Sequence, residues 1–310
     1  MRALNLRIGT RGSPLALAQA REVQRLLAVA QGEGAPAASI HVIRTSGDRI
    51  QDRPLAESGA NKGFFTKEIE EALAAGAIDL AVHSLKDMPT LLPRGLVLAC
   101  WLPRADVRDA FVSLTVPSLA RLPAGATVAS SSLRRAAQLL HLRPDIRVRP
   151  IRGNVETRLK KLADGVADAT ILAIAGLQRL GLGHRVTAAI PVEEMLPAVA
   201  QGAICIEIRE GDAATAECIR PLNHTPTEIA TTAERAFLAG LDGSCRTPIA
   251  ALAEPKGADG LLFRGMLLTP DGRRMLQARR SGSLADAVRL AREAADELRA
   301  SAGPDFLSAP

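Results

Sequence analysis

The sequence predicts an α/β protein with two doubly wound domains, followed by a small α+β domain at the C-terminus. Over the first two thirds of the chain, apolar runs of strand length alternate with amphipathic runs of helix length, and the connections are short. This alternation is typical of parallel sheets with right-handed helical crossovers. From about His224 the pattern changes to one helix, three strand-like runs and a last helix, which indicates a separate α+β domain.

The domain boundaries follow from one late apolar run. Residues 203–208 form this run after the second series of strands and helices, and we expect it to return to the first sheet. The chain would then cross twice between the first two domains, with a cleft between them. We therefore predict domain 1 at residues 1–102 and 200–220, domain 2 at 106–196 and domain 3 at 224–310.

The composition limits the classes of partner. The formal net charge is +6, with six lysines and 33 arginines, which favours bidentate capture of carboxylate or phosphate groups. Aromatic residues make up 2% and there is no tyrosine, which argues against stacking on single-stranded nucleic acid. No apolar run reaches the roughly 18 residues of a membrane span, and none at the start has signal-peptide length, so we expect a cytoplasmic protein. The four cysteines form no CxxC pair, and no metal site is predicted.

An arginine-rich stretch at 129–158 is predicted to form an anion-binding pocket. The pattern predicts a strand ending at Ala129, a serine-capped helix over 133–142, and a second strand–turn–helix junction whose helix starts near Val155. Two helix N-termini would then present backbone N–H donors beside four arginines, a combination that binds anions: Arg134, Arg135, Arg152 and Arg158. The alternative is that each arginine is a solvated surface cation.

The N-terminal strand, expected at 4–9, ends in a similar junction. A turn that contains Arg11 leads into a helix at 15–28. Residues 45–63 are polar and glycine-rich without an apolar period, and a loop of this length inside a compact domain is usually functional or disordered. We interpret it as a lid over the site, with plain disorder as the alternative.

A buried strand expected at 78–82 leads into the acid of greatest interest. Asp87 lies just past the strand's carboxyl end, where open parallel sheets bind ligands. Beside cations such as Arg11 and Lys86 it would stay ionised and could bind cations or N–H donors. The alternative is that Asp87 forms an ordinary ion pair with Lys86 in a surface loop. His83 is expected to be a structural residue at the end of the strand.

Ten short motifs, taken together, resemble those of one protein family. They occur in the family's order over nearly the whole chain: GTRGSPLALAQA at 9–20, KGFFTKEIEEAL at 62–73, DLAVHSLKDMP at 79–89, DAFVS at 109–113, SSLRR at 131–135, RGNVETRL at 152–159, AGLQRLGL at 175–182, LPAVAQGAICIE at 196–207, TAERAFL at 232–238 and GSC at 243–245. The family that they resemble is porphobilinogen deaminase, also called hydroxymethylbilane synthase.

The resemblance implies three domains, of which the first two are like the halves of a type II periplasmic binding protein. It implies a cytoplasmic, monomeric transferase of tetrapyrrole and heme biosynthesis. Such an enzyme condenses four porphobilinogen molecules head to tail, with loss of ammonia, into linear hydroxymethylbilane, which uroporphyrinogen-III synthase would receive. The resemblance also implies a dipyrromethane cofactor, made from two substrate units and attached to Cys245 by a thioether.

By motif position the resemblance also implies the residues of the site. Asp87 is the expected catalytic carboxylate, stabilising positive charge on pyrrole nitrogens. Besides Cys245, cofactor contacts are expected from Ser13, Lys86, Asp87, Ser131, Ser132, Arg134, Arg135 and Arg152. Carboxylates of the substrate and the growing chain are expected to bind Arg11, Arg152, Arg158 and Arg179, with Lys62 as the lysine of the lid.

The sequence departs from the family's pattern at three places. SGANKG replaces a shorter GGKG form, Glu57 stands where some members have a second lysine, and DGSCRTPIA replaces the commoner GGCQVPI, which puts Arg246 beside Cys245. The alternative function is a non-catalytic, two-lobed anion-binding protein with the same arginine-lined cleft. That alternative requires neither Asp87 nor Cys245.

Overall fold

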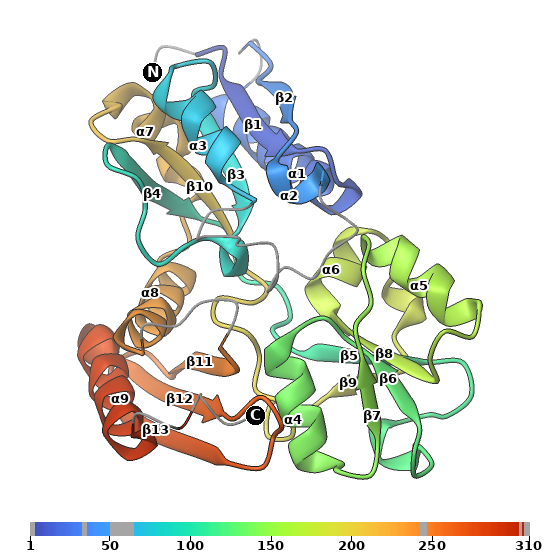
Figure 1. Cartoon of the computed structure of the whole chain (residues 1–310). Coiled ribbons are helices and arrows are strands. Elements are labelled where there is room, and N and C mark those ends of the chain that lie inside the picture. Colours follow the sequence, from blue (N-terminus) through green and yellow to red (C-terminus); the bar gives the residue numbers. More distant parts are fainter. Residues whose placement is uncertain (1–3, 33–35, 50–64, 242–246, 304–305, 307–310) are drawn as a thin grey trace. The chain divides into compact units, whose positions relative to one another are not determined.

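The computed structural model describes the chain except for residues 1–3, 33–35, 50–64, 242–246, 304–305 and 307–310. The chain forms two compact units. Unit 1 contains Met1–Ala105 and Ala203–Glu228, and unit 2 contains Asp106–Gly202 and Ile229–Pro310. Figure 1 shows the elements of each unit, which are described separately below.

Unit 1 is built on a five-stranded mixed sheet. Its strand order is β2 (Ser39–Ile43), β1 (Arg7–Arg11), β3 (Leu80–Ser84), β10 (Ile204–Arg209) and β4 (Leu96–Trp101). β1 is parallel to β2 and β3, whereas β10 runs antiparallel to both β3 and β4. The apolar run at 203–208 therefore returns to the first sheet as predicted. The sheet is parallel from β2 to β3, as the alternation of strands and helices predicts, but it is mixed overall because the returning strand β10 enters in the opposite direction.

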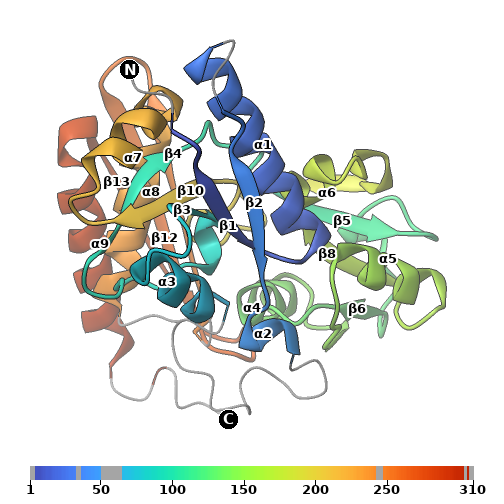
Figure 2. The same ribbon diagram turned by 90° about the horizontal axis from the view of Figure 1, so that it is seen from above.

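Helices cover both faces of this sheet. α1 (Pro14–Gln31) and α7 (Ala213–Ile219) pack against the face that carries Leu80, Val82, Ile204, Ile206 and Ile208. α3 (Lys67–Ala74) packs against the opposite face, where Ala81 lies. Figure 2 shows α1 and α7 on one side of the sheet and α3 on the other. The short elements of the unit are α2 (Ser46–Arg49), η1 (Leu85–Asp87) and η4 (Arg220–Leu222).

The first sheet of unit 2 repeats this strand order. It consists of β7 (Arg147–Arg149), β6 (Thr127–Ala129), β8 (Ala169–Ala173), β5 (Asp109–Ser113) and β9 (Ala188–Ile190). β5 is its antiparallel strand. α4 (Leu133–Leu142) packs on one face, and α5 (Val155–Ala163) and α6 (Ile174–Arg179) pack on the other. The 3-10 turns of this part are η2 (Leu119–Arg121) and η3 (Gly183–Arg185).

The antiparallel strand of each five-stranded sheet directly follows a crossing of the chain. β5 begins four residues after Ala105 ends the first segment of unit 1, and β10 begins two residues after Gly202. In each sheet the fourth strand in the order, β10 or β5, is therefore the first strand that the chain forms after it enters the unit. This is the doubled connection that the sequence predicts.

The second sheet of unit 2 is antiparallel, with the order β11 (Ile249–Lys256), β12 (Gly260–Leu268) and β13 (Met275–Ser283). α8 (Thr225–Gly240) covers one face through Phe237, whose ring centroid lies 5.3 Å from that of Phe263. α9 (Ala287–Ala302), after the short turn η5 (Leu284–Asp286), packs beside β12 and β13 (Figure 1). The opposite face packs Leu252, Met266 and Leu268 against Ala137 of α4 and Leu196.

The two mixed sheets and the separate antiparallel sheet confirm the predicted fold class. Each sheet lies within one of the three predicted domains, although the second and third sheets share unit 2, so the three-domain division stays a prediction. Two elements differ from expectation. The sequence pattern predicts a strand at 169–175 with a connection at 176–181, where the structure has α6 at Ile174–Arg179. It also predicts a helix from Thr231, whereas α8 begins six residues earlier, at Thr225. Among the described residues, no helix is long and apolar enough to cross a membrane.

Candidate functional site

A hollow in unit 1 lies at the carboxyl ends of β1 and β3. Its wall comes from the β1–α1 junction, from the residues before α3 and from the end of β3 with η1: Arg11, Ser13, Leu15, Ala16, Gln19, Phe65, Thr66, Val82, His83, Ser84 and Asp87. The structure thus brings Arg11 and Ser13, which are neighbours in the sequence, together with the distant Asp87. Because β1 and β3 are adjacent and parallel, their ends open at the same edge of the sheet.

Asp87 ends the 3-10 turn η1 and is exposed. Its carboxylate makes no hydrogen bond or ion pair with any residue that the structure describes. The expected alternative, a loop pair with Lys86, is therefore not formed in this structure. A carboxylate held at the mouth of a hollow without an internal partner is available to a cationic or N–H-bearing ligand.

The walls around Asp87 are held by local contacts. The Arg11 guanidinium carbon lies 4.3 Å from the centroid of the Phe65 ring, a cation–π arrangement. Ser13 caps α1, because its hydroxyl oxygen accepts a hydrogen bond from Ala16 N at 3.3 Å. Gln19, which is 2% exposed, donates from Nε2 to Ser84 Oγ at 2.8 Å.

Three titratable side chains lie buried behind this hollow. His83 Nε2 is 3.0 Å from Glu207 Oε2, and Glu70 of α3 is buried as well. Burial raises the pKa of Glu70, and the nearby charge of Glu207 raises it further. The sequence predicted only an apolar strand at 203–208, although a glutamate inside such a strand is itself a signal of a buried polar group.

In unit 2, Arg134 and Arg135 are buried and already paired within the protein, whereas the sequence pattern predicts that they bind an anion in a pocket. They are 5% and 7% exposed and surround Asp109, which is fully buried at the start of β5. Arg134 Nη2 donates to Asp109 Oδ2 at 2.6 Å, and Arg135 Nη2 donates to Oδ1 at 2.7 Å. Gln201 Nε2 adds a third donor at 2.9 Å from Oδ1. The sequence prediction did not include Asp109 as the internal partner of these arginines.

This cluster keeps a surplus of positive charge. Two guanidinium groups against one carboxylate leave a net charge of +1, and Arg134 Nε is buried without a hydrogen-bond partner among the described residues. Burial alone would raise the pKa of Asp109, but the charges of Arg134 and Arg135 overcome this and hold it well below its usual range. The two arginines remain attractive to an anion at the N-terminus of α4.

The two arginine-bearing junctions of unit 2 are joined by a serine. Ser131 Oγ donates to Ile151 O at 2.6 Å and accepts from Ile151 N at 2.9 Å. Ser132 caps α4 by accepting from Arg135 N at 3.4 Å. Arg152, the residue after Ile151, is half-buried, and its guanidinium group has no hydrogen bond or ion pair with a described residue.

The remaining predicted residues lie in different settings. Arg158 Nε donates to Gly153 O at 2.9 Å, and Arg179 Nη2 donates to Gly202 O at 2.8 Å. Lys86 is half-buried beside Asp87. Lys62 and Cys245, expected in the lid and at the cofactor, lie outside the described residues.

The three cysteines that the structure describes, at positions 100, 205 and 218, are buried. Burial raises the pKa of Cys100 to about 12, so it stays a thiol at neutral pH. Burial also raises the pKa of Cys218. The thiols of Cys100 and Cys218 are therefore poor nucleophiles. In the described part of the chain, no group of three or more His, Cys, Asp or Glu side chains could hold a metal ion.

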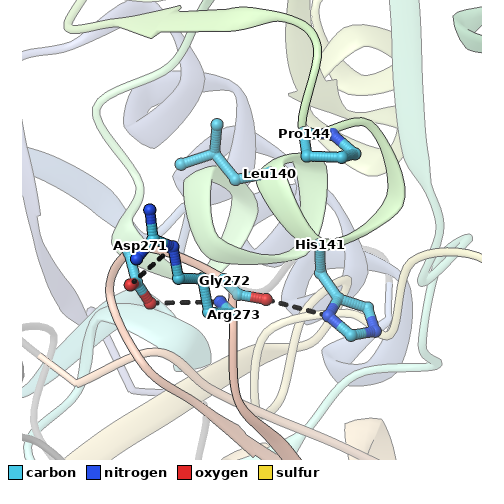
Figure 3. A pocket seen from close by; sticks show the side chains of 6 residues that line it. All are labelled: Leu140, His141, Pro144, Asp271, Gly272 and Arg273. Carbon is cyan, nitrogen blue, oxygen red and sulfur yellow. Dashed lines mark hydrogen bonds and ion pairs between the residues drawn. The ribbon is translucent and has the colours of Figure 1, made fainter.

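A second hollow, of about 390 Å³, lies in unit 2 between α4 and the β12–β13 turn. Figure 3 shows His141 Nδ1 hydrogen-bonded to Gly272 O, at 2.8 Å, with Arg273 beside Asp271. The His141 and Arg273 side chains are solvent-exposed, and no charged residue of this wall is buried. The hollow in unit 1 therefore remains the better candidate site.

Comparison with known proteins identifies the family. Residues 6–217 match the family model described as porphobilinogen deaminase, dipyromethane cofactor binding domain, and residues 229–300 match its C-terminal domain. The chain belongs to the porphobilinogen deaminase family. Porphobilinogen deaminase of Paracoccus denitrificans is 56% identical over 301 residues, covering 97% of this chain and 96% of that protein. The chloroplastic porphobilinogen deaminase of Pisum sativum is 51% identical over 308 residues, covering 98% and 83%.

Solved structures add only a weak likeness. The methionine-binding protein MetQ aligns with 70% of this chain and 87% of its own, at 15% identity and a TM-score of 0.44. The fold is therefore assigned from the strand order and packing described above.

The residues of this porphobilinogen deaminase family member fit a cofactor that carries carboxylates on pyrrole rings. The unpartnered Arg152 guanidinium and the buried Arg134 Nε are donors suited to carboxylates. The unpartnered Asp87 carboxylate is an acceptor suited to pyrrole N–H groups. These observations come from two separately described units, and each is consistent with the matched cofactor-binding domain.

Proposed function

We propose that this chain condenses four porphobilinogen molecules head to tail, with loss of ammonia, into linear hydroxymethylbilane. The reaction takes place on a dipyrromethane primer attached to Cys245 by a thioether. The observation that carries the proposal is the match of residues 6–217 to the dipyrromethane cofactor binding domain, with Asp87 in the wall of that segment's hollow and not paired with any described residue. The primer, when bound, supplies the pyrrole α-carbon that attacks the incoming substrate.

Asp87 acts as the electrostatic centre of the reaction. Loss of ammonia from porphobilinogen places positive charge on the pyrrole nitrogen, and an ionised carboxylate within hydrogen-bonding reach stabilises that charge. No described residue hydrogen-bonds its carboxylate, so both oxygens are available to ring N–H donors. The Gln19–Ser84 contact and the capped start of α1 hold the surrounding wall in place.

The arginines bind the carboxylates of the primer and the growing chain. Every porphobilinogen unit carries an acetate and a propionate, so the anionic charge grows with each addition and needs fixed cations. Arg152, Arg134 and Arg135 bind the primer, with Ser13, Lys86, Ser131 and Ser132 in support. Arg11, Arg158 and Arg179, together with Arg152, bind the substrate and the extended chain, and Lys62 acts from the lid.

Asp109 has a positioning role in this scheme. It fixes the directions of Arg134 and Arg135 through hydrogen bonds of 2.6 and 2.7 Å. The net positive charge of the cluster then acts on the primer from a rigid, buried base. The protein works as a cytoplasmic monomer, without a metal ion, and its product passes to uroporphyrinogen-III synthase.

The intact mass of the purified protein tests the proposal. Before substrate is added, we expect a mass above that of the sequence by two linked pyrrole units, with peptide mapping placing the addition on Cys245. Porphobilinogen should then add substrate-sized steps. The variant Cys245→Ser should carry no such addition, whereas Cys100→Ser should load normally because Cys100 is buried. A bare mass that substrate never changes would support the non-catalytic anion-binding alternative.

A further inference from the structure

The buried cluster behind the Asp87 hollow is not used by the proposed function. His83, Glu207 and Glu70 come from β3, β10 and α3. His83 pairs with Cys205 across the β3–β10 ladder, and Glu207 pairs with Ala81, so the two side chains are diagonal neighbours on one face of the sheet. This is the face that α3 covers, and α3 brings Glu70 to it.

The cluster has more carboxylate oxygens than hydrogen-bond donors to pair with them among the described residues. Glu207 is 0% exposed, and its Oε2 pairs with His83 while its Oε1 is buried without a partner in the described part of the chain. Glu70 Oε1 is likewise buried and unpartnered there. Two ionised carboxylates in this setting carry a large desolvation cost, which bound protons reduce. Burial, followed by the charge of Glu207, raises the pKa of Glu70 in agreement with this.

His83 connects this cluster to the hollow. It forms part of the hollow's wall together with Asp87, and its side chain is 4% exposed. Nε2 is held by Glu207, while no described residue hydrogen-bonds Nδ1. The ring therefore has one nitrogen fixed from behind and one left for a water or ligand. A carboxylate behind an imidazole both orients the ring and stabilises its protonated form.

We propose that His83, backed by Glu207 and Glu70, is the proton-transfer residue of the condensation; this rests on the proposed function. In each cycle the aminomethyl group leaves from its protonated form: its C–N bond breaks, and the electron pair of that bond leaves with ammonia. The α-carbon of the acceptor pyrrole forms the new C–C bond and then loses its proton. That proton goes to His83 Nδ1 and from there to the released ammonia, giving ammonium, so no net proton is consumed. Imidazole suits such a relay because it gains and loses a proton near neutral pH.

The first test reads protonation without activity. Imidazole signals of 15N-labelled protein, which has five histidines, are followed against pH, and His83 is assigned with His83→Gln. Glu207→Gln removes the carboxylate that contacts Nε2, so the His83 midpoint should move to lower pH. Glu70→Gln replaces a carboxyl group whose raised pKa favours its neutral form, so it should move the midpoint in the same direction by less. Glu71→Gln is the matched control, since Glu71 is exposed on the same helix. If the His83 midpoint is the same in the parent, Glu207→Gln, Glu70→Gln and Glu71→Gln, the proposal is overturned.

Other charged groups near the ring must be kept constant in this titration. Arg11 and Asp87 lie in the wall of the same hollow, and Arg209 follows Glu207 on the same face of β10, where it pairs with Asp212. None of the three Glu→Gln variants changes these groups. The order of the midpoints therefore reports the Glu207 and Glu70 charges themselves.

The second test measures turnover against pH in protein whose primer loading is known from its mass. His83→Gln keeps an amide able to bond Glu207 but cannot carry a proton, so kcat should fall by about 100-fold or more, and the part of the pH profile that depends on His83 should disappear. Glu70→Gln, the milder change, should retain folding and shift the pH profile in the direction of its NMR midpoint. Unchanged kcat and pH profile in His83→Gln, with the parent active, would refute the relay alone. An inactive, unloaded parent would instead refute the proposed function.

Discussion

Arg135 donates two hydrogen bonds to Asp109, from Nε at 3.2 Å and from Nη2 at 2.7 Å, and both side chains are buried. Replacing Asp109 with Asn leaves Arg134 and Arg135 without their counter-charge. Breaking a buried pair in this way typically costs about 3–5 kcal/mol of unfolding free energy. Urea denaturation measures that loss. Asp106→Asn is the control, because Asp106 pairs with the largely exposed Arg108 and its loss should cost about 1 kcal/mol or less.

The same pair predicts a pH dependence of stability. The charges of Arg134 and Arg135 hold the pKa of Asp109 below its unfolded value of about 3.9. Its contribution to the unfolding free energy is therefore complete above about pH 5 and falls as the pH drops through about 4 toward the folded pKa. The stability difference between the parent and Asp109→Asn should shrink over that range. A difference that is constant from neutral pH to about pH 3 would contradict the assignment.

Asp87 gives the sharpest test of chemistry without structural loss. Its carboxylate is exposed and unpartnered among the described residues, so Asp87→Asn and Asp87→Ala should keep the thermal midpoint of the parent. Turnover of porphobilinogen should nearly vanish in both, because neither the asparagine nor the alanine side chain carries a negative charge to stabilise the cationic pyrrole. Asp87→Glu retains the charge at a different distance and should recover part of the rate. Near-normal turnover in Asp87→Ala would remove this residue from the mechanism.

The sequence predicted the site in unit 1 better than the one in unit 2. The positions of Arg11 and Asp87 follow from strands that end at the same edge, which is a local pattern. The burial of Arg134 and Arg135 depends on Asp109, about 25 residues away on a strand that enters antiparallel. No local pattern states which strand will lie beside the N-terminus of α4. The Glu207 pair was missed for the same reason, since β3 and β10 are more than 100 residues apart.

The fold shows the same division between local and distant information. The sequence pattern also predicts that 109–113 opens the second strand–helix series. This segment and the predicted helix at 133–142 match β5 and α4 residue for residue, because apolar periodicity and serine caps mark them locally. The mixed direction of the sheets was missed, since strand direction depends on the route by which the chain re-enters a unit. α6 was missed because it follows β8 without a polar turn or a capping side chain.

Among the arginines of the site, Arg152 is the one whose substitution should affect ligand binding without affecting stability. Its guanidinium group makes no hydrogen bond or ion pair with a described residue, so Arg152→Leu should leave stability nearly unchanged. Loss of a charge-assisted contact to a carboxylate, about 1.5–3 kcal/mol, should weaken primer or chain binding by roughly 10- to 100-fold. Intact mass measures loading, and KM for porphobilinogen measures chain binding. Arg121→Leu, an exposed arginine in the same unit, is the control, and equal behaviour of the two variants would make Arg152 a surface residue.

Gly272 joins the antiparallel sheet to α4 within unit 2. Its φ is +72°, and a Cβ there would lie 2.4 Å from Ala137 O and 2.7 Å from His141 N, so Gly272→Ala adds a backbone clash to the strain of a left-handed conformation. Gly257, with φ +64° and open space around it, is the matched control, because Gly257→Ala carries the strain alone, about 1–2 kcal/mol. Urea denaturation should show a larger loss for Gly272→Ala, by roughly 1–3 kcal/mol, as overpacking against backbone typically costs. Equal losses in the two variants would mean that the turn moves away from α4 without cost.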